Sequence, residues 1–181
     1  MMVKQGIKFF YVMCLMGVIF ASMSLIGVNT EEETYDIGEL GGMPNSPYCL
    51  QMYTSIEKYS EQYNIPKYIA YNVAYLETGY RGPFDWNYDH RQISSAGAKG
   101  PMQIIPKYAH AFVNGKITEK ELLRNIDLNV MVSMKMLRAW YKIHRDWTLA
   151  CGAYNSGRPI QNGYARYASS NKNYKNKWVK Y

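Results

Sequence analysis

The sequence contains few cysteines and histidines, and this limits the kinds of site that it can hold. Cys14 lies in an N-terminal apolar run, so only Cys49 and Cys151 remain as a pair that could form a disulfide in an oxidising compartment. The three histidines are scattered without the spacing of metal ligands, and we expect no metal site. The chain also lacks the glycine-rich loop that cradles phosphates in nucleotide sites, so we expect no cofactor.

The N-terminal segment, residues 1–28, has the pattern of an export signal. Lys4 and Lys8 precede an uncharged run from Phe9 to Thr30 that has small residues near its far end. The run is also long enough to span a bilayer, so a cleaved signal peptide and an N-terminal membrane anchor are both open. Either outcome predicts an exported protein of the periplasm or cell envelope.

Residues 29–47 are predicted to form a flexible linker, because they combine acidic residues with glycines and prolines and show no periodicity. The linker could also recruit the chain to a cell-envelope assembly. The folded part is predicted to be a single domain over residues 48–181, since 181 residues are too few for two ordinary domains.

Negative charge is missing from the C-terminal end of the chain. The formal net charge is +7, and the segment from Arg158 to Tyr181 holds six cations and no carboxylate. Such a segment attracts acidic polymers. Nucleic acid is one of them, but an exported protein more often meets anionic cell wall or lipid headgroups, so we expect no nucleic-acid partner.

The spacing of apolar residues predicts a mainly helical domain with no internal repeat and at most a short β element. A first helix should direct Leu50 and Ile56 to the core, and a second should begin at Pro66 and stop at Gly79. Residues 80–100 are predicted to form a long loop. Further helices are expected from Pro106 through Phe112, after a capping box at Thr118 and Glu121, after a cap at Asp127, from Asp146 through Tyr154, and near Trp178.

Glu77 is the strongest candidate for a catalytic residue. It follows the apolar positions Ile69, Val73 and Leu76 and precedes the helix-stopping Gly79. In the last turn of a helix the macrodipole disfavours negative charge, and apolar neighbours disfavour ionisation, so we expect its pKa to be raised. A carboxyl that keeps its proton near neutral pH can serve as a general acid. The alternative is an ordinary surface glutamate near a helix end.

Two later segments could hold a sugar chain. Residues 94–103 begin at Ser94 and end in the amide of Gln103, with glycines that let the backbone approach a bulky ligand. Residues 153–157 place the phenol of Tyr154 beside the amide of Asn155. Each segment alone could also be a plain turn or helix end.

Taken together, these motifs resemble those of the lytic transglycosylases of the goose-type lysozyme-like superfamily, over about Tyr48 to Tyr181. The matching stretches, in order, are Tyr63-Asn64-Ile65-Pro66, Glu77-Thr78, Gly100-Pro101-Met102-Gln103 with Pro106, Ala153-Tyr154-Asn155-Ser156-Gly157, and Asn173-Tyr174. Three positions depart from the family pattern: Thr78 stands in place of serine, Pro101 in place of leucine, and Ser156 in place of alanine.

The resemblance implies a mainly α, α+β lysozyme-like fold with a long active-site loop, and a peptidoglycan lytic transglycosylase that cuts the bond between N-acetylmuramic acid and N-acetylglucosamine without water. Glu77 would act first as acid and then as base, and Tyr174 would orient it. The substrate-binding residues would be Thr78, Ser94, Gly100, Met102, Gln103, Tyr154, Asn155 and Tyr174, and the partner would be the peptidoglycan glycan strand.

Two other functions remain open at this point. One is a hydrolytic muramidase on the same fold, in which Asp85 or Asp89 supplies a second carboxylate that positions water. The other is a catalytically weak glycan-binding component of a cell-envelope machine, motivated by the departures at Thr78 and Pro101.

Overall fold

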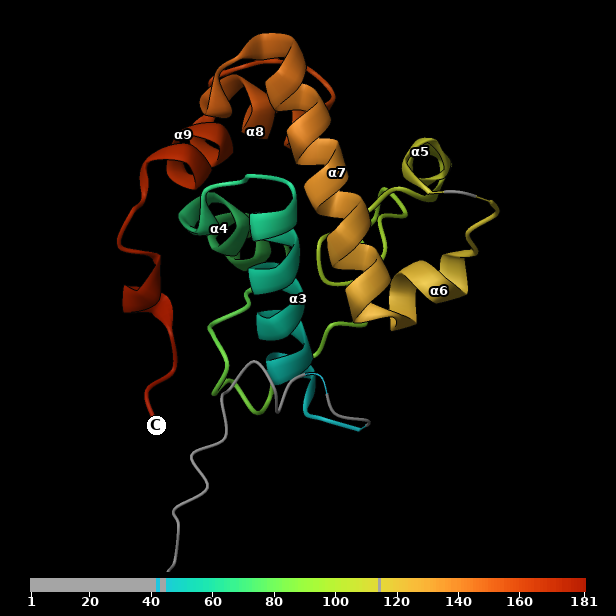
Figure 1. Ribbon diagram of the computed structural model, residues 1–181, viewed down its shortest axis with the longest axis vertical. Coiled ribbons are helices and arrows are strands. Elements are labelled where there is room, and N and C mark those ends of the chain that lie inside the picture. The colour runs from blue at the N-terminus through green and yellow to red at the C-terminus, as the bar shows by residue number, and fades with distance from the viewer. Residues whose placement is uncertain (1–41, 43–44, 114) are drawn as a thin grey trace, which may run out of the picture. The chain divides into compact units, whose positions relative to one another are not determined.

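A computed structural model of the chain describes residue 42 and residues 45–113 and 115–181 (Figure 1). The signal or anchor predicted over residues 1–28 lies outside the described residues, as does most of the linker predicted over residues 29–47. In the described part, no helix is long and apolar enough to cross a membrane.

The described residues form a helical domain. Its helices are α3 (Tyr48–Gln62), α4 (Lys67–Thr78), α5 (Pro106–Ala109) with the short 3₁₀ helix η1 (His110–Phe112), α6 (Glu119–Arg124), α7 (Ile126–His144), α8 (Trp147–Ser156), α9 (Gly163–Ser170) and the 3₁₀ helix η2 (Tyr174–Lys177). Extended pairing in these residues consists of two isolated bridges, Ile93 with Lys99 and Lys99 with Ile104. The predicted fold class, mainly α with at most a short β element, is confirmed.

The helix boundaries follow from local chemistry. Gly79 ends α4 in the left-handed conformation with φ 72°, which glycine adopts without strain. The capping box of Thr118 and Glu121 begins α6, as predicted. The cap expected at Asp127 was wrong: Asn125, directly before α7, accepts a hydrogen bond from the backbone N–H of Leu128 at 3.0 Å. Asp127 already lies inside the helix.

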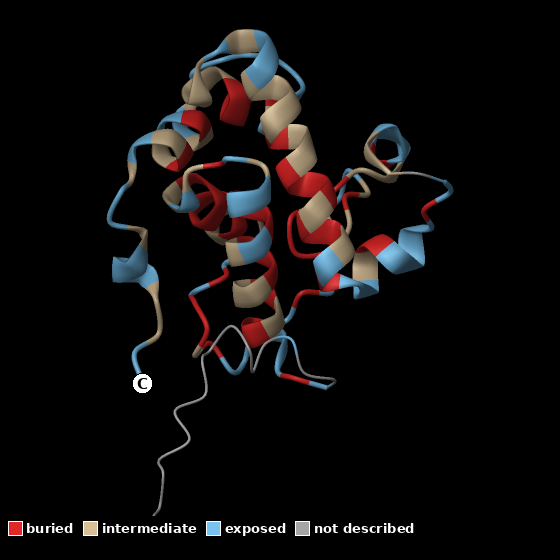
Figure 2. Cartoon of the chain, viewed as in Figure 1, coloured by how far each residue is buried: buried red, intermediate tan, exposed pale blue. Residues whose placement is uncertain are grey.

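Asp127 instead joins α7 to α3. Its carboxylate accepts a hydrogen bond from the Tyr59 hydroxyl at 2.6 Å and pairs with Lys58 at 3.4 Å. In Figure 1, α3 and α7 run side by side, and α4 lies next to α3. Helices α8 and α9 cover one end of this group, and α5 and α6 lie on the side of α7 that faces away from α3. Buried residues line the facing sides of α3, α4 and α7 (Figure 2).

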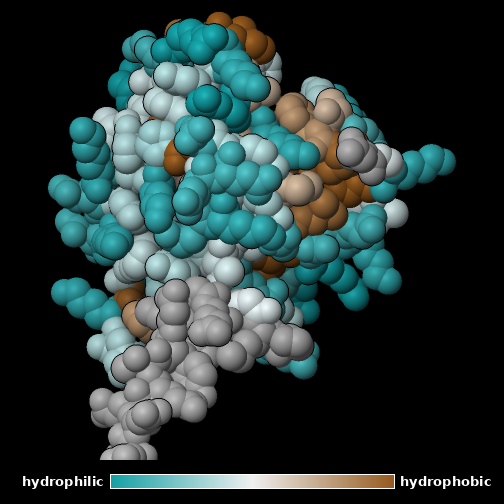
Figure 3. Space-filling model, viewed as in Figure 1, coloured by the Kyte–Doolittle hydropathy of each residue, from teal (hydrophilic) through white to brown (hydrophobic). Residues whose placement is uncertain are grey.

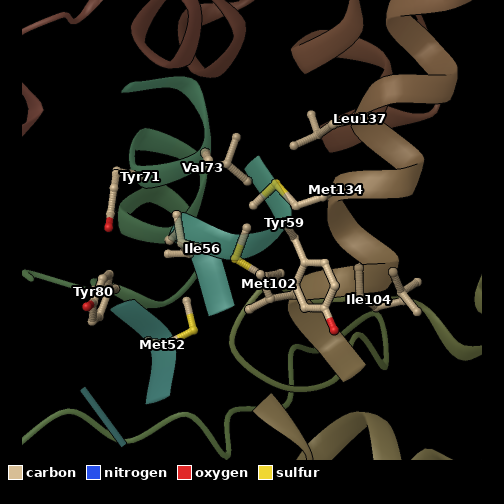
Figure 4. Close-up of a cluster of buried hydrophobic side chains, with 14 of the residues drawn as sticks. Met52, Ile56, Tyr59, Tyr71, Val73, Tyr80, Met102, Ile104, Met134 and Leu137 are labelled. Carbon is tan, nitrogen blue, oxygen red and sulfur yellow. The ribbon is translucent and has the colours of Figure 1, made fainter. Parts of the chain in front are cut away.

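The core joins the helices to the loop that follows α4. Figure 4 shows Met52 and Ile56 from α3, Val73 from α4 and Met134 from α7 together with Met102 from the loop. All five side chains are fully buried. Full burial of a side chain of this size contributes about 1.5–3 kcal/mol. The hydrophobic effect therefore fixes the loop as firmly as the helices, and with it the residues on either side of Met102.

The chain end is held by an aromatic cluster. The Tyr174 ring stacks on Tyr71 with centroids 5.0 Å apart, and Trp178 meets Tyr71 edge-on at 5.2 Å. A Cβ on Gly82 would lie 2.6 Å from Trp178, so the loop after α4 packs directly against this indole. The cluster fastens η2 to α4.

Cys49 and Cys151 are both buried, and both are free thiols.

Candidate active site

Glu77 lies in the last turn of α4 and is half-buried. Burial raises the pKa of its carboxyl to about 7, because removing water penalises the charged form. A hydrogen bond from the Tyr164 hydroxyl to Glu77 Oε1, 2.5 Å long, lowers the pKa and so limits this rise. A carboxyl with a pKa near 7 can both release and recover a proton at neutral pH.

Tyr164 reaches Glu77 from α9. The side chain of Asn162 caps this helix by accepting a hydrogen bond from the backbone N–H of Ala165 at 2.8 Å, which fixes the first turn that carries Tyr164. Burial and the nearby charge of Glu77 keep the pKa of Tyr164 well above its ordinary value. The phenol therefore keeps its proton and acts as a donor to the carboxylate.

Thr78 is buried and faces the loop. Its hydroxyl donates to the Pro101 carbonyl at 2.8 Å and lies 2.8 Å from the Tyr88 hydroxyl. Since the single proton of Thr78 goes to the carbonyl, Tyr88 is the donor in the second contact. Thr78 thus fastens the end of α4, and Glu77 with it, to the loop segment at Pro101.

Gly100 allows this loop segment to turn tightly against α6 and α7. Its φ is +74°, and a Cβ at this position would lie 2.3 Å from the Leu122 carbonyl and 2.6 Å from the side chain of Asn129. Asn129 is fully buried and uses its amide fully: it donates to the carbonyls of Lys99 and Leu122 and accepts from the backbone N–H of Met102 at 2.9 Å. No side chain larger than hydrogen fits at residue 100.

Tyr154 contacts the same segment from α8. Its hydroxyl donates to the Met102 carbonyl at 2.6 Å, and the Ser133 hydroxyl, 2.9 Å away, donates to Tyr154 in turn. Burial holds the pKa of Tyr154 well above its ordinary value, and the charge of Glu77 adds to the effect. Asn129, Ser133 and Tyr154 together hold Met102 from two helices.

Gln103 follows Met102 with φ 49°, a left-handed conformation that is unusual outside glycine. Its side-chain amide donates to the carbonyls of Gly100 at 2.9 Å and Gln92 at 3.1 Å, which secures the strained turn. Ser94 closes the preceding turn, accepting a hydrogen bond from the N–H of Ala98 at 3.1 Å. Gln103 is half-buried, so part of its side chain faces solvent.

Asn155 is exposed at the end of α8 and accepts a hydrogen bond from the Asn162 side chain at 3.2 Å. It is thereby linked to the cap of the helix that carries Tyr164.

The two aspartates considered for a hydrolase are both in ion pairs. Asp85 is buried against Arg81 at 3.1 Å, and Asp89 pairs with Arg91 at 3.2 Å.

Tyr174 lies elsewhere than the resemblance implied. Its ring is stacked in the cluster with Tyr71 and Trp178, and the phenol that contacts Glu77 is Tyr164. The reason is the packing of α9 on α4, which directs the first turn of α9 to the Glu77 end of α4. Tyr164 was missed because 18 tyrosines gave no basis for choosing it. Asn162, a cap directly before a new helix, was the available signal.

The structure brings together the ends of α4 and α8, the start of α9 and the loop around Gly100, with Glu77 among them. Within the described ranges, no group of three histidine, cysteine or acidic residues could hold a metal ion. The arrangement supplies one proton-carrying carboxyl, one phenol that stabilises its anion, and amides from Gln103 and Asn155 at the edges.

The family model described as "Transglycosylase SLT domain" matches residues 54–177, which include every site residue described above. Searches of curated proteins and of solved structures gave no match. The match spans more than half of the chain and supports a peptidoglycan-acting function of the lytic transglycosylase type. The chain belongs to the transglycosylase SLT domain family.

Proposed function

We propose that this protein is a peptidoglycan lytic transglycosylase that cleaves the β-1,4 bond between N-acetylmuramic acid and N-acetylglucosamine and leaves 1,6-anhydro-muramic acid ends. The observation that carries the proposal is the half-buried carboxyl of Glu77, whose pKa is about 7 and whose Oε1 accepts a hydrogen bond from Tyr164 at 2.5 Å. The family match supports the substrate class.

In the first step, Glu77 would protonate the glycosidic oxygen as the bond to the anomeric carbon of muramic acid breaks. Because Oε1 already accepts from Tyr164, the transferable proton would be on Oε2. Glu77 becomes a carboxylate in this step, and the hydrogen bond from Tyr164 becomes stronger because its acceptor is now charged. This bond favours the state formed during the reaction over the starting state.

In the second step, the Glu77 carboxylate would accept the proton of the muramic 6-hydroxyl while that oxygen bonds to the anomeric carbon. The proton returns to Glu77, the 1,6-anhydro ring closes, and no water is consumed. A single carboxyl therefore serves as acid and base. The salt bridges of Asp85 with Arg81 and Asp89 with Arg91 support this route over a hydrolytic one, because they direct both carboxylates to arginines of the same loop, and no hydrogen bond among the described residues joins either aspartate to Glu77.

The sugars would be bound by the side chains at the edges of the site. Gln103 would accept from a sugar hydroxyl through its amide oxygen, and Asn155 would hold a second sugar from the opposite side. Tyr154 would contribute its ring, because its hydroxyl is already bonded to Met102 and Ser133. Four further residues would shape the site through their contacts with the loop backbone: Thr78, Ser94, Gly100 and Met102.

We also infer that the protein acts outside the cytoplasm. The support is the sequence of residues 1–28, which has the pattern of an export signal, together with a substrate that is itself extracytoplasmic. Whether residues 1–28 are removed or kept as an anchor can be read from the N-terminus of the exported protein by peptide mass spectrometry.

Mass spectrometry of the fragments released from purified peptidoglycan tests the activity. We expect fragments that end in 1,6-anhydro-muramic acid, and none with Glu77→Gln at equal protein concentration. An Asp85→Asn, Asp89→Asn double variant is the control and should give the same anhydro products. Fragments with reducing muramic ends would instead establish a hydrolase, and a folded protein that releases nothing would make a glycan-binding role the leading interpretation.

A further inference from the structure

The charge of this protein is divided between two parts of the chain. Residues 128–181 hold ten lysines and arginines and a single side-chain carboxylate, Asp146, whereas residues 1–127 hold eleven cations and thirteen carboxylates. Ion pairs follow the same division. In the part of the chain that the structure describes, they all lie between residues 57 and 127. Asp146 itself caps α8 through the N–H groups of Thr148 and Leu149.

The cations of this C-terminal part are at the surface. Those from residue 158 onward are all exposed: Arg158, Arg166, Lys172, Lys175, Lys177 and Lys180. The surface over α8 and the end of α7, as seen in Figure 3, is mostly hydrophilic. Residues 158–181 contain no side-chain carboxylate, and none of these six cations forms an ion pair among the described residues, although Lys175 and Lys177 lie over aromatic rings. The surface therefore carries an excess of positive charge that attracts anionic partners.

Two of these cations lie on segments that form the candidate active site. Arg158 is in the loop of residues 157–162, between Asn155 and Tyr164. Arg166 lies two residues beyond Tyr164 on α9, about half a helical turn around, so it faces away from the side of α9 that carries Tyr164. Neither arginine has an ion pair among the described residues. Of the two, Arg158 follows directly on the exposed end of α8 that carries Asn155, so an anion on the substrate beyond Asn155 would find its guanidinium group without an ion pair.

The loop that carries Arg158 is held in one conformation. The Ser156 hydroxyl accepts from the backbone N–H of Arg158 at 3.4 Å, and the Arg166 side chain donates to the Gln161 carbonyl at 2.6 Å. The loop also presses on α8, because a Cβ on Gly152 would lie only 1.9 Å from the Ile160 carbonyl. A cation on a fixed backbone loses less entropy on binding than one on a mobile loop.

We propose that Arg158 binds a carboxylate of the peptide stems that peptidoglycan strands carry, on a loop that Arg166 helps to hold. The assignment rests on the proposed function, because the stems are attached to the muramic acid residues beside which Glu77 would act. A guanidinium group pairs with a planar carboxylate through two parallel hydrogen bonds, which favours arginine over lysine here. The lysines of η2 and of the chain end add a longer-range attraction for the same polymer.

The test is the affinity of the protein for soluble glycan strands of equal length with and without peptide stems. Fluorescence anisotropy is measured in a Glu77→Gln background, so that the strands stay intact. We expect stem-bearing strands to bind about tenfold more tightly at low salt, since several exposed pairs each contribute a few-fold. The advantage should narrow as salt screens the charges.

The variant Arg158→Gln should weaken binding of stem-bearing strands about threefold and leave bare strands unaffected. Lys142→Gln is the matched control: it removes one exposed positive charge at the end of α7, outside the loop and α9, and should change neither affinity. Equal affinity for the two kinds of strand would refute the proposal. Equal losses from the two variants would also refute it, because attraction by net charge would then suffice.

A competition arm separates carboxylate from phosphate as the anion. Vesicles that contain anionic phospholipid, added at equal charge, should not displace the stem-bearing strands, and displacement would assign the surface to lipid headgroups. Failure here is distinct from failure of the proposed activity. If strands with and without stems both give anhydro products but bind with equal affinity, only the role of Arg158 is rejected. If stem-bearing strands bind more tightly but no anhydro products form, only the catalytic assignment is rejected.

Discussion

Replacing Tyr164 by phenylalanine should change the pH dependence of the reaction as well as its rate. The substitution removes the only atom that donates to Glu77 Oε1 among the described side chains and leaves the ring in place. That hydrogen bond lowers the pKa of Glu77 against the larger effect of burial, so its loss should raise the pKa further above 7. A hydrogen bond to a charged group contributes about 1.5–3 kcal/mol, which corresponds to about one to two pKa units.

The sign of the change follows from the general-acid role proposed for Glu77. The free enzyme must carry the proton, so kcat/KM should fall as the pH rises through the pKa of about 7. In Tyr164→Phe this alkaline limb should move up by about one unit or more. The plateau should be lower by about 10- to 100-fold, because the carboxylate formed in the transition state has lost its donor.

The assay is release of soluble muropeptides from peptidoglycan, followed from pH 5 to 9 for the wild type and the variant. Tyr167→Phe is the control, since Tyr167 is on the same helix and its buried hydroxyl has no hydrogen-bond partner in the described structure. It should leave the pH profile unchanged. An alkaline limb that stays in place in Tyr164→Phe, with the fold intact, would show that Tyr164 does not control the ionisation of Glu77.

Three further predictions concern stability and the loop. The pKa of Glu77 is raised in the folded state, so its contribution to stability is complete below the unfolded pKa of 4.5 and is lost as the pH rises through about 7. Glu77→Gln should therefore stabilise the fold by up to about 3 kcal/mol at pH 8 and by little at pH 4, as measured by urea unfolding. Gly100→Ala should lower the stability of the fold by more than about 2 kcal/mol. Gly97 also has a positive φ, but a Cβ there would meet nothing within 4 Å, so Gly97→Ala should lower the stability by only about 1 kcal/mol. Equal losses of stability in thermal unfolding would contradict the proposed clash at Gly100. Thr78→Ser should keep the hydrogen bond to the Pro101 carbonyl and most of the activity, whereas Thr78→Val should lower kcat at least tenfold. A fully active valine variant would mean that this hydrogen bond does not position Glu77.

The sequence predicted the elements whose signals are local. Pro66 and Gly79 bound α4 because each has a backbone preference that acts without tertiary help. The position of Glu77 and the direction of its pKa shift follow from the same local pattern, since an apolar helix must pack its last turn as well. The short β element was also anticipated, because glycines and polar residues interrupt the segment from residue 80 to 100.

Residues that act through distant contacts could not be chosen from the sequence. Tyr164 meets Glu77 across 87 positions of the chain, and only the packing of α9 on α4 decides that it, rather than Tyr174, supplies the phenol. No local sequence signal distinguishes Asn129 from other residues of α7, yet its buried amide holds the loop. Asp127 was mistaken for a cap because capping and salt-bridge formation use the same side chain, and the sequence does not show that Tyr59 and Lys58 lie opposite it.

Met102 has a consequence for how fast the site can be filled. Its side chain is in the core and its backbone is bonded to Asn129 and Tyr154, so the segment before Gln103 cannot swing away as a lid would. A strand would meet this segment already in place, and no closure of the turn at residues 100–102 would precede the chemistry. Association should then be limited by diffusion and by the alignment of a long, stiff polymer, and the turnover of short soluble strands should show no lag.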